Sequence, residues 1–288
     1  MVIKNVLFCC LALLSMQTLA QEEPVIETGI HPVAVREVVI NALVRSAVNG
    51  NPYSLTELGW MLEIGFTVPQ DLEKAREHYE AGSKHGVARA TGKLGLMYLH
   101  GNGVEKDVAK ALTLISKAAQ QGDAEAQNNL GSLYAHGYVG PPDQAKAKYW
   151  YEIAAEAGLE TAQYNLGHMY EYGNGVAVNY DLAASWYEKS ARGGDLDAHN
   201  NLGFLLADGP LEMRNPERAV YYFATAAALG HPLALLNLGQ MYMAGRGGLP
   251  ADEERGLQLI QASAMLGNEK AQTIMNELST GSPAPNRG

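Results

Sequence analysis

The hydrophobic and polar positions of the chain repeat with a period of 36 residues. Six Leu-Gly pairs mark this period, and their leucines are Leu58, Leu94, Leu130, Leu166, Leu202 and Leu238. Around each pair, the pattern Ala-x-x-x-Leu-Gly-x-x-Tyr places three side chains on one face of a helix, as for Ala162, Leu166 and Tyr170. A pattern that recurs at this period predicts an array of similar structural units.

A second helix is predicted in each unit after the one that carries Leu-Gly. Each begins after an Asp or Asn, namely Asp71, Asp107, Asp143, Asn179, Asn215 and Asp252. Each ends before a glycine, namely Gly86, Gly122, Gly158, Gly194, Gly230 and Gly267. Asp and Asn accept hydrogen bonds from the free amides of a first helical turn, and glycine tolerates the left-handed conformation that ends a helix. Each unit is therefore expected to be a helical hairpin.

The glycine of each Leu-Gly pair is expected to allow close approach of the second helix. Glycine inside a helix costs about 1 kcal/mol relative to alanine, so a packing gain must compensate. An alanine column on the second helices, including Ala111, Ala147 and Ala183, is expected to face these glycines. The pairs Trp150-Tyr151 and Trp186-Tyr187 are expected to fill the space between repeats.

The pattern also predicts the ends of the array. Six full repeats are expected over 53–267, with a capping helix over 32–52 and another over 268–279. Residues 21–31 and 280–288 carry no apolar periodicity and are expected to be disordered. The predicted fold class is therefore all-α, an α-solenoid of helix-turn-helix repeats.

The first twenty residues have the composition of a secretory signal peptide. Lys4 precedes an apolar run over 6–14, and small residues lead to a predicted cleavage site after Ala20. The run is too short to span a bilayer comfortably, so the mature chain is expected to be exported and not inserted in a membrane. Both cysteines, Cys9 and Cys10, lie in this leader, and lipidation of one of them is an alternative.

The charge balance argues against nucleic acid as a partner. The chain has 21 Lys and Arg against 31 Asp and Glu, a formal net charge of −10. Such a chain repels phosphate backbones and anionic lipid head groups.

The repeat resembles the Sel-one-like repeat, a relative of the tetratricopeptide repeat. The resemblance covers roughly residues 33–278 and is clearest where the loop is intact, as in Gly101-Asn-Gly-Val104 and Gly173-Asn-Gly-Val176. The loops that begin at Gly137 and Gly209 depart from it. The resemblance implies a right-handed superhelix whose first helices line the concave side. It also implies an adaptor, regulator or inhibitor that holds another protein.

Candidate binding residues flank the Leu-Gly pairs on this concave side. They are Asn128, Asn129, His136, Tyr164, Asn165, His168, Tyr172, Asn200, Asn201 and Phe204. Asparagine both donates and accepts hydrogen bonds, which suits a peptide backbone, and aromatic residues are enriched at binding hot spots. The alternative is that the asparagines satisfy groups between adjacent repeats and contact no partner.

The sequence offers no recognisable catalytic or metal-binding motif. It contains no Gly-x-Ser-x-Gly, Ser-x-x-Lys or His-Glu-x-x-His, and no two histidines are spaced i, i+4 on one helix. No enzyme activity, cofactor or metal is predicted. The predicted function is a periplasmic or secreted scaffold that binds another envelope or secreted protein. The alternative is a cell-wall or glycan-directed hydrolase or binding protein, with Glu63 and Glu171 as groove-facing carboxylates.

Overall fold

The computed structural model describes residues 32–66, 68–138 and 140–280. The predicted leader over 1–20, the segment 21–31 and residues 281–288 lie outside this part of the chain. Two compact units are present, Met1–His78 and Tyr79–Gly288, and the boundary falls within one helix. Among the described residues there are fourteen α-helices, one short 3-10 helix and no strand. This confirms the predicted all-α solenoid.

The helices follow the predicted register. The first unit contains α2 (Pro32–Val48), α3 (Pro52–Ile64) and the start of α4 (Leu72–Lys84). The second unit continues from α4 with α5 (Ala88–His100), α6 (Val108–Gln120), α7 (Ala124–Ala135), α8 (Gln144–Glu156), α9 (Glu160–Tyr172), α10 (Tyr180–Arg192), α11 (Leu196–Asp208), η1 (Leu211–Met213), α12 (Pro216–Ala228), α13 (Pro232–Ala244), α14 (Glu253–Met265) and α15 (Glu269–Thr280). Odd-numbered helices from α3 to α13 carry Leu-Gly, and even-numbered helices from α4 to α14 are their partners.

The predicted caps begin the second helices. The Asp107 carboxylate accepts a hydrogen bond from the Lys110 backbone N–H at 2.9 Å, and Asn179 accepts one from Leu182 N–H at 3.0 Å. The same bond starts α4, α8, α12 and α14. In α12, Pro216 occupies the first helical position, where its missing donor is not needed. Local hydrogen bonding therefore sets where each hairpin turns.

The Leu-Gly glycines bring the two helices of a hairpin into close contact. A Cβ at Gly167 would lie 2.6 Å from Cδ1 of Tyr187, and one at Gly203 would lie 2.7 Å from Cε1 of Phe223. Real Cβ atoms do not approach neighbours this closely. A ring or an isoleucine of the second helix, four residues after the alanine column, covers the glycine in five hairpins. These side chains are Ile115 over Gly95, Tyr151 over Gly131, Tyr187 over Gly167, Phe223 over Gly203 and Ile260 over Gly239.

Adjacent repeats are joined by tryptophan and glutamine side chains. Trp150 packs on the core around Ile115, and Trp186 packs on the core around Ala147. The amide of Gln163 donates to the Ala155 carbonyl at 3.1 Å, which satisfies the end of the preceding helix. The prediction for the Trp-Tyr pairs was therefore half right. The tryptophans fill the space between repeats, whereas Tyr151 and Tyr187 cover the glycines of their own hairpins.

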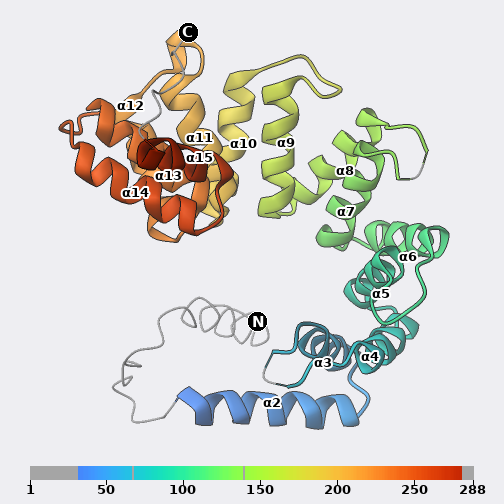
Figure 1. Cartoon of the computed structure of the whole chain (residues 1–288). Helices are drawn as coiled ribbons and strands as arrows, with labels where there is room; N and C mark the ends of the chain where they lie inside the picture. The colour runs from blue at the N-terminus through green and yellow to red at the C-terminus, as the bar shows by residue number, and fades with distance from the viewer. Residues whose placement is uncertain (1–31, 67, 139, 281–288) are drawn as a thin grey trace. The chain divides into compact units, whose positions relative to one another are not determined.

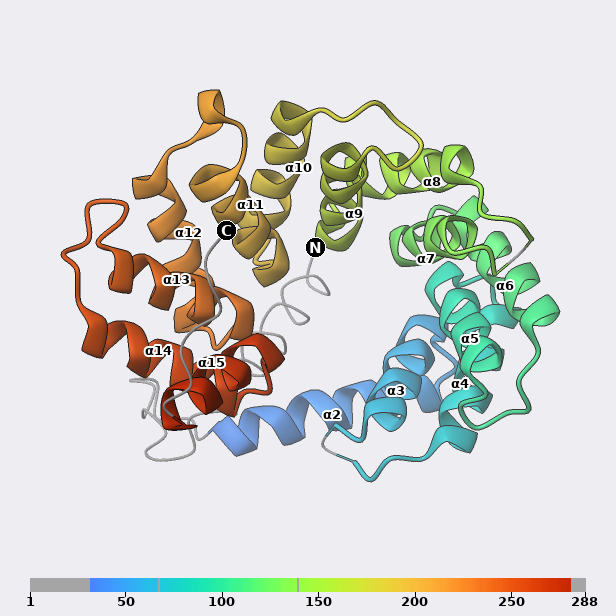
Figure 2. The ribbon, with the colours of Figure 1, turned by 45° about the horizontal axis from the view of Figure 1, so that its top comes forward.

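Within the second unit, the hairpins stack so that first helices lie beside first helices. α5 contacts α7, and α11 contacts α13. Figures 1 and 2 show α7, α9 and α11 on the inner side of this unit's curve, with α8, α10 and α12 on its outer side. Side chains of the first helices that point away from the second helices therefore form one continuous surface, which we call the first-helix face.

Candidate binding face

The predicted asparagines form hydrogen bonds from one repeat to the next. Asn165 donates to the Oδ1 of Asn128 at 2.8 Å, and Asn237 donates to the Oδ1 of Asn200 at 2.9 Å. In each pair, the residue before Leu-Gly contacts the residue one place earlier in the preceding repeat. Asn200 is only 3% exposed. These contacts favour the alternative in which the asparagine column holds the first helices together.

Asn201 belongs to the same column but takes part in a larger buried network. Its amide lies 3.3 Å from the Tyr164 hydroxyl and 3.4 Å from the Tyr187 hydroxyl. The Tyr187 hydroxyl donates to Oε2 of Glu171 at 2.6 Å. Burial, reinforced by this hydrogen bond, raises the pKa of Tyr187 far above its usual value. The network ties α9, α10 and α11 together and keeps the Tyr187 proton in place.

Glu171 does not face the surface as the sequence suggested. Glu171 is only 8% exposed, and its carboxylate accepts a hydrogen bond from the Tyr187 hydroxyl. In a helix, the residue before Tyr172 is rotated by about 100° from it, which here turns Glu171 into the hairpin. A catalytic carboxylate must reach its substrate, so the structure argues against the predicted hydrolytic role of Glu171.

Asn129 differs from the other asparagines of its column. The acceptor position in the preceding repeat, which corresponds to Asn128, is Gly92 and has no side chain to receive the Asn129 amide. At this joint, Lys93 instead approaches Oε2 of Glu125 at 2.7 Å, and Arg89 lies 3.9 Å from the same carboxylate. Asn129 itself is half-buried.

Aromatic side chains line the first-helix face on α9 and α11. Tyr164, His168 and Tyr172 follow one another at i, i+4 spacing on α9. The rings of His168 and Tyr172 are 4.5 Å apart, and those of Tyr164 and His168 are 6.4 Å apart. Phe204 occupies on α11 the position of His168 on α9. Tyr172 is 59% exposed and Phe204 is 48% exposed.

We call His168, Tyr172 and Phe204 together the inner aromatic cluster. These three side chains carry little charge. Burial lowers the pKa of His168, although the nearby Glu171 carboxylate acts in the opposite direction. His168 is therefore mostly neutral near pH 7. The cluster offers apolar ring surface and can be covered by a partner without a large cost for burying charge.

His136 and its neighbour Tyr138 extend the exposed aromatic surface at the end of α7. His136 Nδ1 is 2.9 Å from the Ser132 carbonyl oxygen, and its ring lies 6.3 Å from the ring of Tyr138. Tyr138 is exposed. The sequence reasoning did not select Tyr138. The departure of its loop from the Gly-Asn-Gly-Val pattern was the signal that could have identified it.

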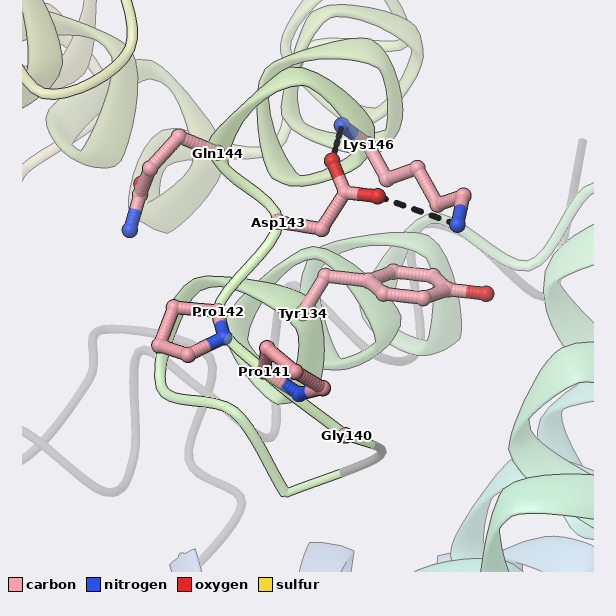
Figure 3. Close-up of a pocket in the computed structure, with 7 residues that line it drawn as sticks. All are labelled: Tyr134, Gly140, Pro141, Pro142, Asp143, Gln144 and Lys146. Atoms are coloured by element: carbon pink, nitrogen blue, oxygen red, sulfur yellow. Dashed lines mark hydrogen bonds and ion pairs between the residues drawn. The ribbon is translucent and has the colours of Figure 1, made fainter.

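The turn after α7 also contains a shallow pocket of about 590 Å³. Figure 3 shows Tyr134, Pro141 and Pro142 on one side of it, with Asp143 and Lys146 on the other. Asp143 and Lys146 form an ion pair at 3.0 Å, so their charges are already matched. None of the predicted binding residues lines this pocket.

The described residues offer no other obvious chemistry. Over 32–66, 68–138 and 140–280 there is no group of three or more His, Cys, Asp or Glu that could hold a metal ion. None of the helices in these ranges is long and apolar enough to cross a membrane.

The solved structures that are similar to this chain include two bacterial proteins at more than 30% identity. One is a protective antigen of uropathogenic Escherichia coli with an SLR fold, at 34% identity and a TM-score of 0.71. The match covers 83% of this chain and 51% of that protein, so the chain spans about half of its length. The other is a Sel1 repeat protein of Oxalobacter formigenes, at 31% identity and a TM-score of 0.69, with 82% and 91% of the two chains covered. A search of curated proteins found no match.

The family comparison covers most of the chain. The model of the Sel1 repeat matches six times, at residues 52–87, 88–123, 124–159, 161–195, 196–231 and 232–268. These matches follow the same 36-residue register as the helices. The chain therefore belongs to the Sel1 repeat family, whose members are protein-interaction scaffolds.

Proposed function

We propose that this chain is an exported scaffold of the bacterial envelope that binds another protein through the first-helix face of repeats three to five. The inner aromatic cluster is the centre of this site, and His136 and Tyr138 lie towards one end of it. The scaffold acts as an adaptor, regulator or inhibitor of an envelope or secreted protein. The asparagine pairs hold the surface in shape and contribute little contact of their own.

The exposure of Tyr172 and Phe204 carries this proposal. Each of the two side chains leaves about half of its surface or more in solvent, on the face that the family's scaffold architecture leaves open. The hairpin packing does not require them, because buried leucines such as Leu166 and Leu202 form the core of the same helices. Large exposed aromatics that cluster on a scaffold mark interaction sites.

Site-specific photo-crosslinking tests the binding face. A benzoylphenylalanine at Phe204 should capture a protein partner in the cells that make this chain. The matched control is the same group at Tyr221, which is 64% exposed but lies on the second helix α12. We expect a cross-linked species from position 204 and none from position 221. Cross-links from position 221 alone would place binding on the other face.

Export rests on the leader and has its own test. The proposal expects the mature chain to begin at Gln21, because Ala20 is the predicted cleavage site. N-terminal sequencing of the protein from a periplasmic extract measures this directly. A chain that keeps Met1 and fractionates with the cytoplasm would contradict export. The proposal for the binding face would still stand, because it does not depend on the leader.

A further inference from the structure

A buried carboxylate accompanies the inner aromatic cluster. Glu171 is next to Tyr172 and three residues after His168 on α9, and it is only 8% exposed. Its carboxylate accepts a hydrogen bond from the Tyr187 hydroxyl, and no Lys, Arg or His of the described residues forms an ion pair with it. The negative charge of Glu171 is therefore met by a neutral donor and not by a cation.

The charge of Glu171 acts on the exposed rings around it. Burial lowers the pKa of His168, and the Glu171 carboxylate opposes this shift. Burial raises the pKa of Tyr172, and the same carboxylate raises it further. Both effects of the carboxylate have the sign of a negative potential, which favours the protonated form of each ring. Because a buried charge is screened less than an exposed one, this potential extends to the surface of the cluster.

The first-helix face has no cation of its own around this potential. The helices α7, α9, α11 and α13 contain no Lys or Arg, whereas each second helix from α6 to α14 contains at least one. Lys93 and Arg246 reach carboxylates of α7 and α11, but they are already paired, with Glu125 at 2.7 Å and with Asp208 at 2.8 Å. A cation that approaches the face from solution therefore meets a negative potential and little repulsion.

The most exposed rings of the cluster are also free of cations from this chain. Elsewhere the chain does place cations on rings, as where Lys110 lies 3.9 Å from the centre of the Tyr98 ring. Among the described residues, no such contact is found at Tyr172 or Phe204, which are 59% and 48% exposed. These two rings are thus open to a cation from another molecule, which a ring face attracts.

We propose that the inner aromatic cluster binds an arginine side chain of the partner protein, with Glu171 as its buried counter-charge. This inference rests on the proposed function, because it names the partner chemistry that the same face recognises. A planar guanidinium stacks on aromatic faces and is more weakly hydrated than an ammonium. It would lie on the Tyr172 ring, which adjoins Glu171 in the chain. The face thereby selects a basic segment over a neutral or acidic one.

Two small probes test this inference without knowledge of the partner. Acetyl-arginine amide carries the guanidinium, and acetyl-citrulline amide is its neutral isostere. Each probe is titrated into the purified protein while NMR follows the ring signals of Tyr172 and His168. We expect saturable shifts with the arginine probe and much smaller shifts with the citrulline probe. Equal shifts with the two probes, or no shifts with either, would overturn the proposal.

Two variants locate the bound cation. Glu171→Gln removes the charge but keeps an acceptor for the Tyr187 hydroxyl, and Tyr172→Leu removes an exposed ring. Each should weaken binding of the arginine probe at least about threefold, the scale of a cation–π contact at an exposed site. Tyr172→Leu decides the outcome if Glu171→Gln does not fold. Glu156→Gln, the same change of charge at an exposed position of the second helix α8, is the matched control and should bind as the wild type does.

The outcomes separate this inference from the proposed function. An equal loss of probe binding in Glu156→Gln would show that only the net charge matters, and it would overturn the cation site. Capture of a partner by cross-linking at Phe204 would still support the binding face in that case. Normal binding of the arginine probe without any cross-linked partner would contradict the proposed function alone.

Discussion

Two joints of the array, between α5 and α7 and between α9 and α11, use different side chains for the same task. The first joint has Gly92 in place of an amide, and the ion pair of Lys93 with Glu125 spans the gap. The second joint is a buried network of Asn201, Tyr187 and uncharged neighbours around Glu171. Both joints keep the 36-residue register. The helical hairpins therefore fix the fold, and the first-helix face is free to vary in chemistry from repeat to repeat.

The hairpin core should be far less tolerant than either joint. Gly167→Leu places a side chain against the fully buried ring of Tyr187, which has no room to move. Overpacking of a core costs typically about 1–3 kcal/mol and occasionally more, and we expect the upper end here. Urea unfolding of the variant measures the loss. His168→Leu, one residue along the same helix, is the control and should change the free energy of unfolding little.

Position in the array should also matter. Overpacking at Ala271, which is wholly buried in α15, should loosen only the last helices, because each repeat contacts only its neighbours. Hydrogen exchange should show faster exchange confined to α14 and α15 for Ala271→Leu, and spread on both sides of α9 for Gly167→Leu. Equal spreading in the two variants would contradict a stacked array.

The buried network at the α9–α11 joint gives the next largest effect. Tyr187→Phe removes the hydroxyl that donates to Glu171 and leaves a buried carboxylate short of a donor, at a cost of about 1–3 kcal/mol. Tyr151→Phe is the matched control, because Tyr151 covers Gly131 in the same way but has Ser132 beside its hydroxyl. The loss of unfolding free energy should be clearly smaller for the control. Equal losses would mean that Glu171 is not held by this bond.

The pH dependence of stability should show the burial of His168. The folded protein binds a proton at His168 less readily than the unfolded chain does, because burial lowers its pKa below the ordinary 6.5. As the pH falls through this value, the unfolded state takes up the proton first, and the free energy of unfolding decreases. His168→Gln should reduce this decrease when unfolding is compared at neutral and mildly acidic pH. An unchanged slope would show that His168 titrates normally.

The ion pair at the α5–α7 joint should give the smallest effect. Lys93→Gln should cost about 0–1 kcal/mol, since the Glu125 carboxylate remains partly exposed. Added salt should reduce the difference between the variant and the wild type, because it screens exposed charges. Thermal unfolding at low and high salt measures this. A larger cost than that of Tyr187→Phe would reverse the ranking of the two joints.

The sequence predicted the hairpins well because their signals are local. An Asp or Asn such as Asp107 caps a helix through bonds to its own next turn, and glycine at Gly86 or Gly122 ends one through its own backbone. These landmarks need no knowledge of distant residues. The close contact at Gly167 was also predicted, since a glycine inside a helix needs a packing reason.

The candidate face was harder to predict because it depends on neighbours from other repeats. Nothing near Asn165 in the sequence shows that its amide is bound to Asn128 on the preceding hairpin. Glu171 was expected at the surface, but its burial depends on Tyr187 from the next helix. Exposure is likewise a property of the assembled array, so Tyr138 emerged only from the structure.

The most direct test of the central claim compares the two faces of the array against one partner, identified by cross-linking at Phe204. The double variant Tyr172→Ala with Phe204→Ala should weaken binding at least about tenfold, a loss of about 1.4 kcal/mol, as expected for hot-spot aromatics. Tyr149→Ala with Tyr221→Ala, which removes two exposed rings from second helices, should bind as the wild type does. Calorimetric titration of both variants, with matched unfolding curves, would give this result. Normal binding by the first variant and loss by the second would contradict the claim that the first-helix face is the binding face.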